Sequence, residues 1–282
     1  MGNDETYDLD GRTLLVTGAS SGIGRTTALG LGRRGAQVLL ACRSAGPTAA
    51  VVDEIAALAG PGRAEHVPLD LDDLASVRAC ARQVLDRDEP LDVLVNNAGL
   101  AGHKGVTAQG FERTFGVNHL GHFLLTSLLL EHLRDQGKTR VVNVASDAHY
   151  GPKRIDFDAQ LRPTRSFGGL KEYQVSKLCN VLFTQELARR LDGTGVTTYA
   201  VHPGVVASNI WRKVPWPIRP IAVRFMTSVE DGALASLHCA TEPGIEHLSG
   251  RYFERREPKE PSPVATPELA AELWSRSVEW TS

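Results

Sequence analysis

The chain of 282 residues has little of what marks nucleic-acid binding, membrane insertion or disulfide stabilisation. Its formal net charge is only −2 and no basic block stands out, so a nucleic-acid partner is not indicated. No run of about 18 consecutive apolar residues occurs, so no membrane-spanning helix is expected. The four cysteines lie far apart without a C-x-x-C pair, which fits a reduced compartment. We therefore expect a cytoplasmic protein without stable membrane insertion.

The N-terminal residues 1–9 form a polar, acidic tail that resembles neither a signal peptide nor a membrane anchor. Met1, Gly2 and Thr6 match a loose myristoylation pattern, but a frayed tail is the simpler interpretation. A chain of this length can bury roughly 75% of its unfolded surface. Because no internal repeat or linker is visible, we expect a single domain over residues 1–282.

Short apolar runs alternate with helix-like stretches along the whole chain. Such runs, rich in Val and Leu, are typical of buried parallel strands. The expected strands are Thr13–Val16, Gln37–Ala41, Glu65–Leu69, Val93–Asn96, Arg140–Val144, Thr197–Val201 and Arg251–Phe253. The expected helices include Leu74–Asp86, Gly110–His132, Gln174–Leu191 and a C-terminal helix that Thr266 caps. This alternation predicts an α/β fold, a doubly wound parallel sheet of about seven strands with helices on both faces.

A glycine-rich turn, Thr17–Gly24, joins the first apolar run to a helix-like stretch. Such a turn lets the backbone approach a pyrophosphate, which the helix N-terminus then stabilises. The alternative is that the glycines serve packing alone. On the binding interpretation, the residues that contact a dinucleotide are Gly18, Ser20, Ser21, Gly22, Ile23 and Gly24.

Tyr173 and Lys177 are four residues apart, so they share one face of a helix. A phenol ordinarily titrates near pH 10, and a nearby ammonium favours the phenolate. We therefore expect Lys177 to lower the pKa of Tyr173. The pair predicts a proton donor or acceptor near neutral pH, as interconversion of a carbonyl and an alcohol requires.

Three motifs in this order resemble the classical short-chain dehydrogenase/reductase family: Thr17–Gly24, Asn96-Asn97-Ala98-Gly99, and Tyr173-x-x-x-Lys177. The resemblance runs from about residue 10 to the C-terminus. It implies a Rossmann-like domain that binds a nicotinamide cofactor, which supplies a hydride.

The resemblance also implies the roles of single residues. Tyr173 is then the acid, Ser146 orients the substrate oxygen, and Lys177 holds the ribose, while Asn118 holds a water in a proton relay. Further cofactor contacts are implied at Asp70, Leu71, Asn97, Ala98, Gly99, Pro203, Gly204, Val206 and Ser208. Ser146 as a turn residue and Asp70 as a helix cap are the plainer alternatives. His119 and His122 lack an acidic partner, so no metal site is expected.

Arg43 stands where NAD-preferring folds carry an acid that binds the ribose 2′-hydroxyl. An arginine there can bind a 2′-phosphate, with Ser44 assisting. We therefore expect NADP(H), although a solvated surface arginine would look the same.

Longer matches resemble the retinol dehydrogenase and WW-domain-oxidoreductase branch, at Asn118–Leu125, Leu182–Ala188 and Ser236–Ala240. An apolar N-terminal anchor is missing, which favours a soluble reductase of another lipophilic compound, such as a secondary metabolite. Residues 205–227, with Trp211 and Trp216, are expected to cover the substrate, or else to pack on the core or a second subunit. Members of the resembled family often form dimers or tetramers, so the resemblance is compatible with a homo-oligomer. The rival functions are an epimerase or dehydratase, and a non-catalytic NADP-binding regulator.

Overall fold

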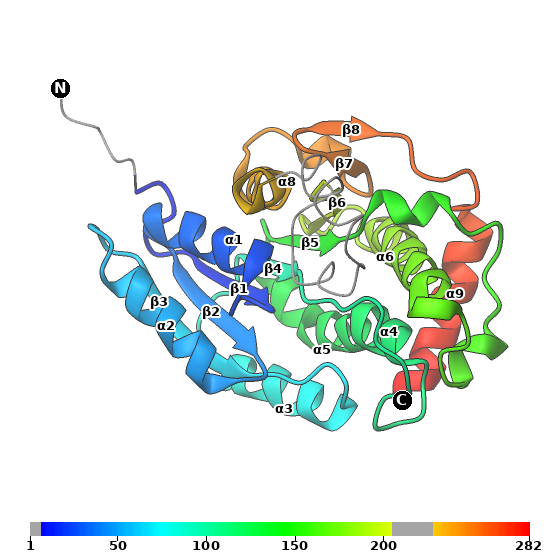
Figure 1. Cartoon of the computed structure of the whole chain (residues 1–282). Coiled ribbons are helices and arrows are strands. Elements are labelled where there is room, and N and C mark those ends of the chain that lie inside the picture. The colour runs from blue at the N-terminus through cyan, green and yellow to red at the C-terminus, as the bar shows by residue number, and fades with distance from the viewer. Residues whose placement is uncertain (1–6, 205–227) are drawn as a thin grey trace.

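Eight strands form one sheet in the computed structural model, which describes residues 7–204 and 228–282. The strand order is β3-β2-β1-β4-β5-β6-β7-β8, and all neighbours are parallel except β7 and β8. The strands are β1 (Thr13–Thr17), β2 (Gln37–Cys42), β3 (Arg63–Pro68), β4 (Val93–Asn96), β5 (Arg140–Val144), β6 (Thr197–His202), β7 (Tyr252–Glu254) and β8 (Glu257–Lys259). The expected doubly wound α/β fold is confirmed (Figure 1).

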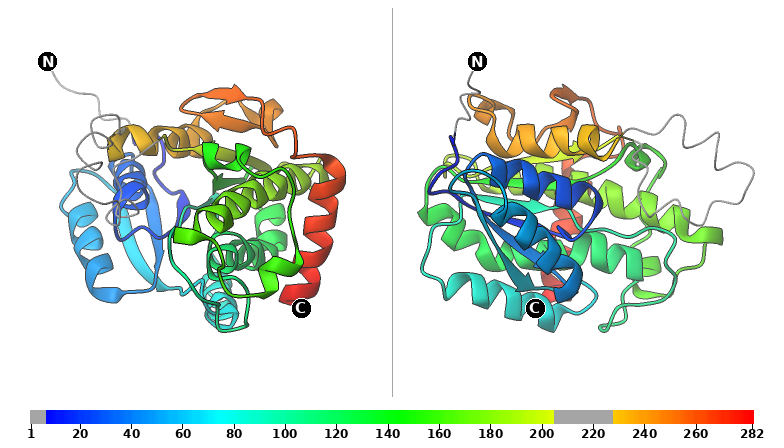
Figure 2. Two further views of the ribbon diagram at one scale, coloured as in Figure 1. Left: turned by 45° about the vertical axis from the view of Figure 1, so that its right-hand side comes forward. Right: turned by 60° about the vertical axis from the view of Figure 1, so that its left-hand side comes forward.

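Helices cover both faces of this sheet. The helices are α1 (Gly22–Arg33), α2 (Ala45–Ala56), α3 (Leu74–Leu85), α4 (Arg113–Phe115), α5 (Gly121–Asp135), α6 (Leu170–Arg190), α8 (Val229–Thr241) and α9 (Pro267–Thr281). Leu14 and Val16 of β1 pack in one core with α1, α2 and α8, whereas Leu15 packs in the other core with α3, α5 and α6. This alternation is the period of two that places successive strand side chains on opposite faces. Helix α9 lies outside α6 (Figure 2).

The C-terminal helix begins as the sequence predicts. The Thr266 side chain accepts a hydrogen bond from the main-chain nitrogen of Leu269, and Pro267 occupies the first turn. Proline suits this position because the first main-chain N–H groups of a helix have no partner within it. Within the described parts of the chain, no helix is long and apolar enough to span a bilayer.

Two expected helices were wrong in extent, and the sheet has one strand more than expected. The helix expected over Gly110–His132 begins only at Arg113, because Gly110 has a left-handed φ of 87° and lies in a turn. Its chain then passes through a π-helical turn, Gly116–Leu120, before α5. Helix α6 begins at Leu170, four residues before the expected start. The eighth strand, β8, contains Pro258, which is tolerated because β8 is an edge strand.

Candidate active site

A cavity of about 370 Å³ opens at the carboxyl ends of the parallel strands. This is the edge at which open α/β sheets bind their ligands. The predicted residues that line it are Gly18, Ser20, Ser21, Gly22, Ile23, Gly24, Arg43, Ser44, Asp70, Leu71, Asn97, Ala98, Gly99, Tyr173, Lys177 and Pro203. Gly204 follows Pro203 at the end of β6. Val206, Ser208, Trp211 and Trp216 fall in 205–227, outside the described residues.

The glycines of the turn have two different surroundings: Gly24 is tightly packed, whereas the space beside Gly22 is open. A Cβ on Gly24 would overlap the Asn97 side-chain amide and would lie 2.5 Å from the Gly18 carbonyl oxygen. Gly24 is therefore required for packing, which was the alternative explanation for the glycines of this turn. Gly22, by contrast, has a left-handed φ of 56° and nothing within 4 Å of where its Cβ would stand. The backbone there is open to a ligand, so the turn fits the pyrophosphate of a dinucleotide.

Thr17 joins the glycine turn to the end of β4. Its Oγ1 accepts hydrogen bonds from the main-chain nitrogens of Asn97 and Ala98, both at 2.9 Å. The same hydroxyl lies 2.9 Å from Nε2 of His122, whose Nδ1 lies 3.0 Å from the Asn118 carbonyl oxygen. A carbonyl only accepts, so Nδ1 carries the proton and Thr17 donates to Nε2. Burial lowers the pKa of His122 to about 4, which keeps the ring neutral.

Neither Thr17 nor His122 was given this role from the sequence. Thr17 is the first residue of the glycine motif, which was the available signal, whereas His122 was considered only as a metal ligand. His119 also has a partner in the protein, because its Nε2 lies 3.1 Å from Oγ of Ser277 on α9. Both imidazoles are thus engaged in hydrogen bonds within the fold.

Tyr173 lines the cavity from α6, whereas Ser146, which follows the end of β5, lies close to Tyr173 without lining the cavity. Burial raises the pKa of Tyr173, and a hydrogen bond with Ser146 opposes the rise. The expectation that Lys177 lowers the pKa of this phenol was therefore wrong for the structure as it stands, because desolvation dominates. The phenol is protonated at neutral pH and able to donate. The Ser146 hydroxyl also accepts a bond from the Ala148 main-chain nitrogen at 3.2 Å, so the turn role holds as well.

Lys177 reaches the same corner of the cavity. Its side chain is 4% exposed and its Nζ donates to the Val144 carbonyl oxygen at 2.8 Å. Nζ lies 5.7 Å from the centroid of the Tyr173 ring. Burial lowers the pKa of Lys177 to about 8, since the charged form loses its hydration.

Asn118 lies within the π-helical turn and is fully buried. Its Oδ1 accepts from the Leu100 main-chain nitrogen at 2.8 Å, and its Nδ2 donates to the Leu100 oxygen and to Ser176 Oγ, both at 3.0 Å. The side chain thus connects the β4 loop with α6, one residue before Lys177. Turns of this kind occur frequently at functional sites. The relay role of Asn118 remains a prediction.

Residues 12–155 match the short chain dehydrogenase family. The chain belongs to the short-chain dehydrogenase/reductase family. Human retinol dehydrogenase 12 is 44% identical over 96% of this chain and 86% of its own length. A bovine dehydrogenase/reductase, SDR family member 13, is 45% identical over 95% of this chain and 73% of its own length. The resemblance to the retinol dehydrogenase branch is confirmed by these relatives.

Two solved structures show the same dehydrogenase/reductase fold. A Mycobacterium paratuberculosis protein of uncharacterised function is 35% identical, with a TM-score of 0.79 over 98% of this chain and 97% of that one. A Beutenbergia cavernae protein, assigned as an NAD(P)-dependent gluconate 5-dehydrogenase, was solved with bound NADP at low occupancy. It is 28% identical, with a TM-score of 0.72 over 88% of this chain and 96% of that one.

Proposed function

We propose that this chain is an NADP(H)-dependent oxidoreductase that interconverts a carbonyl and an alcohol on a lipophilic small molecule, such as a secondary metabolite. The observation that carries the proposal is that Tyr173 and Lys177 line the cavity that the glycine turn also borders, with Ser146 close enough to hydrogen-bond Tyr173. The proton donor Tyr173 and the hydroxyl of Ser146 thus lie near a glycine turn that suits the pyrophosphate of a dinucleotide.

In carbonyl reduction, the nicotinamide cofactor would supply the hydride when bound. Tyr173, which burial keeps protonated, donates its phenolic proton to the substrate oxygen. Ser146 donates a hydrogen bond to the same oxygen and stabilises the developing charge. Lys177 places a buried cationic group near the tyrosine and the cofactor ribose. Oxidation of an alcohol uses the same groups in reverse.

NADP(H) is favoured over NAD(H) by the wall at the end of β2. Arg43 and Ser44 line the cavity there and both are exposed, and residues 41–44 contain no acid. A guanidinium can bind the 2′-phosphate through charge-assisted hydrogen bonds. The Beutenbergia cavernae relative with bound NADP supports the same preference.

A lipophilic substrate is favoured because the chain is more similar to retinol dehydrogenases than to the gluconate 5-dehydrogenase. Human retinol dehydrogenases 12 and 11 are 44% and 46% identical to this chain, whereas the gluconate 5-dehydrogenase is 28% identical. We propose a cytoplasmic location as well, which the four free, buried cysteines support. Fractionation of the native host, with the protein recovered in the membrane pellet, would contradict that location.

The proposal is tested by mixing the purified protein with NADPH or NADH and following nicotinamide absorbance. The carbonyl panel runs from retinal and long-chain aldehydes through bulky ketones to 5-ketogluconate. We expect turnover of lipophilic carbonyls with NADPH, and loss of that turnover in Tyr173→Phe. Binding of NADPH without turnover of any substrate would favour the regulator. Conversion of a substrate to an isomer or a dehydrated product without net nicotinamide change would favour the epimerase or dehydratase.

A further inference from the structure

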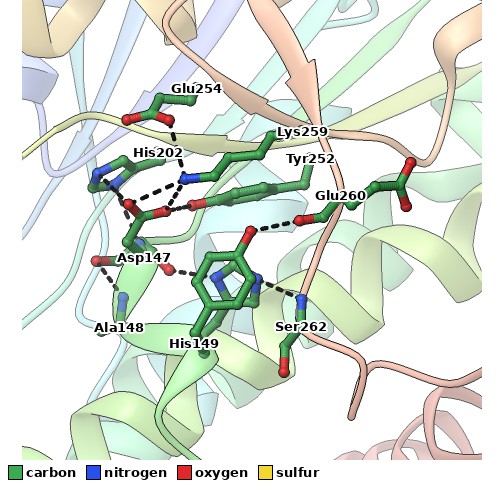
Figure 3. Close-up of polar contacts among 11 residues, drawn as sticks. Asp147, Ala148, His149, His202, Tyr252, Glu254, Lys259, Glu260 and Ser262 are labelled. Carbon is green, nitrogen blue, oxygen red and sulfur yellow. Dashed lines mark hydrogen bonds and ion pairs between the residues drawn. The ribbon is translucent and has the colours of Figure 1, made fainter.

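A network of polar side chains, most of them buried or half-buried, joins the turn that follows Ser146 to the C-terminal hairpin β7–β8 (Figure 3). Asp147 and His149 belong to the short 3-10 helix that follows Ser146, η2 (Asp147–Tyr150). We propose that His149 and Asp147 are positioning residues for Ser146. His149 holds the Ser146 carbonyl through its Nδ1–H, in the tautomer that the Ser262 N–H sets at Nε2, and Asp147 ties the same turn to the β7–β8 hairpin. This inference rests on the proposed catalytic role of Ser146.

His149 forms one hydrogen bond on each side of its ring. Its Nδ1 lies 2.7 Å from the Ser146 carbonyl oxygen, and its Nε2 lies 3.0 Å from the main-chain nitrogen of Ser262. The carbonyl can only accept and the N–H can only donate, so Nδ1 carries the proton and Nε2 does not. The side chain is fully buried, and burial lowers its pKa, which keeps this single neutral tautomer. His149 is therefore a bridge of fixed polarity between two main-chain segments.

The main chain around Ser146 is held from both directions. The Ser146 carbonyl also accepts from the main-chain nitrogen of His149 at 3.0 Å. Before it, the nitrogen of Ala145 donates to the Val201 oxygen at 2.8 Å, within the sheet. After it, the nitrogen of Asp147 donates to Nδ1 of His202 at 3.3 Å. The main-chain nitrogens of both neighbouring residues and the carbonyl of Ser146 itself are thus all in hydrogen bonds. These bonds fix the position from which the Ser146 hydroxyl projects.

The Asp147 carboxylate fastens the same turn to the hairpin. It accepts from the Tyr252 hydroxyl at 2.8 Å and from Lys259 Nζ at 3.3 and 3.4 Å. Lys259 also bonds Glu254 at 3.1 Å (Figure 3). Ligand atoms of Asp147, His202 and Glu254 lie within 4.8 Å of one another, a grouping that could suit a metal ion. Because the Lys259 ammonium bonds two of these carboxylates, the protein supplies the cation itself, and we propose no metal here.

The ring of His149 is held in place by aromatic neighbours as well. Its centroid lies 4.5 Å from that of Tyr252, edge to face, and 4.0 Å from that of Tyr150. Only a small shift of the Ser146 hydroxyl is needed to matter, because a misplacement of about 1 Å can cost about a hundredfold in rate. The hairpin and the Ser262 segment therefore influence the position of the Ser146 hydroxyl, although they do not line the described cavity wall.

Two substitutions separate the two bonds of His149. In His149→Asn the amide nitrogen reaches about as far as Nδ1, so it can still donate to Ser146 but cannot accept from Ser262. In His149→Gln the amide oxygen reaches about as far as Nε2, so it can accept from Ser262 but cannot donate to Ser146. Both variants are measured with Ser146→Ala for kcat, KM, NADPH binding and the melting temperature.

We expect His149→Gln to lower kcat by about 10- to 100-fold and His149→Asn by no more than about threefold, with NADPH binding unchanged in both. Equal kcat values in the two variants, or a kcat that follows only the melting temperature, would overturn the inference. Wild-type kcat in Ser146→Ala would instead overturn the proposed catalytic role of Ser146, and absence of turnover in the wild-type protein would overturn the proposed function, so the failures are distinguishable.

Tyr252→Phe tests the Asp147 anchor of the same turn, so it remains decisive for the proposal if neither His149 variant folds: it keeps the ring against His149 and removes only the hydroxyl that bonds Asp147. We expect a loss in kcat of about three- to tenfold in a folded protein that binds NADPH normally. Adding Tyr252→Phe to Ser146→Ala should then lower kcat no further, because no hydroxyl remains to be positioned. An unchanged kcat in Tyr252→Phe, or an equal loss in both backgrounds, would refute the positioning role.

Discussion

The two sides of the cavity are built from different parts of the polypeptide. On the side of β1, β2 and β4, the wall is mainly backbone in close contact, as where Gly18 and Gly24 pack against Asn97 and Ala98. On the side of β5 and α6, the wall includes the side chains of Tyr173 and Lys177, which hydrogen bonds hold in place, with Ser146 close to Tyr173. The first side should therefore be sensitive to added atoms, and the second side to the loss of single polar atoms.

The largest effect should come from removing one oxygen atom on the side-chain wall. Tyr173→Phe should lower kcat by roughly 10²- to 10⁴-fold, the usual contribution of a positioned general acid. NADPH binding, followed by nicotinamide fluorescence, should stay close to that of the wild type. A variant that keeps more than about a tenth of the wild-type rate would show that another group supplies the proton.

Arg43→Asp tests the side chain on the backbone wall that is proposed to bind the 2′-phosphate of the cofactor. A charge-assisted hydrogen bond contributes about 1.5–3 kcal/mol, so the NADPH-to-NADH ratio of kcat/KM should fall by about 10- to 150-fold. Arg162→Asp makes the same charge change at an exposed residue outside the cavity wall and serves as the control. A ratio that changes equally in both variants, or in neither, would make Arg43 an ordinary surface charge.

Gly24→Ala adds a single methyl group to the backbone wall. The new Cβ would overlap the Asn97 amide and the Gly18 carbonyl, so we expect a loss of about 1–3 kcal/mol in the free energy of unfolding and weaker NADPH binding. Gly46→Ala is the matched control, because nothing lies within 4 Å of its Cβ position in α2. Its stability should be unchanged or slightly higher. Equal melting temperatures for the two variants would contradict the tight contact at Gly24.

The smallest effect concerns the pH dependence that Lys177 gives to the side-chain wall. Burial lowers the pKa of Lys177 to about 8, so this residue loses its proton as the pH rises through that value. Burial raises the pKa of Tyr173, so the phenol stays protonated over the same range. We expect kcat/KM for carbonyl reduction to decline from about pH 8 upward. A decline that begins only above pH 10 would assign the alkaline limb to the phenol.

The sequence alone was enough to predict the parallel sheet, its seven parallel strands and most residues of the cavity wall. Those features depend on chain neighbours: a run of apolar residues makes a buried strand, and a glycine turn after it meets the sheet's carboxyl edge. Tyr173 and Lys177 could be paired for the same reason, because four residues along a helix bring two side chains to one face.

Other features were decided only by the tertiary structure. The direction of the Tyr173 pKa shift depends on burial by distant segments, and no local pattern reports that desolvation. The bond between Thr17 and His122 joins residues 105 positions apart, and that between His149 and Ser262 joins residues 113 positions apart. Strand β8 owes its existence to pairing with β7 rather than to its own residues, which include a proline. Hydrogen bonds and dielectric environment act through space, so they become defined only when the sheet brings these segments together.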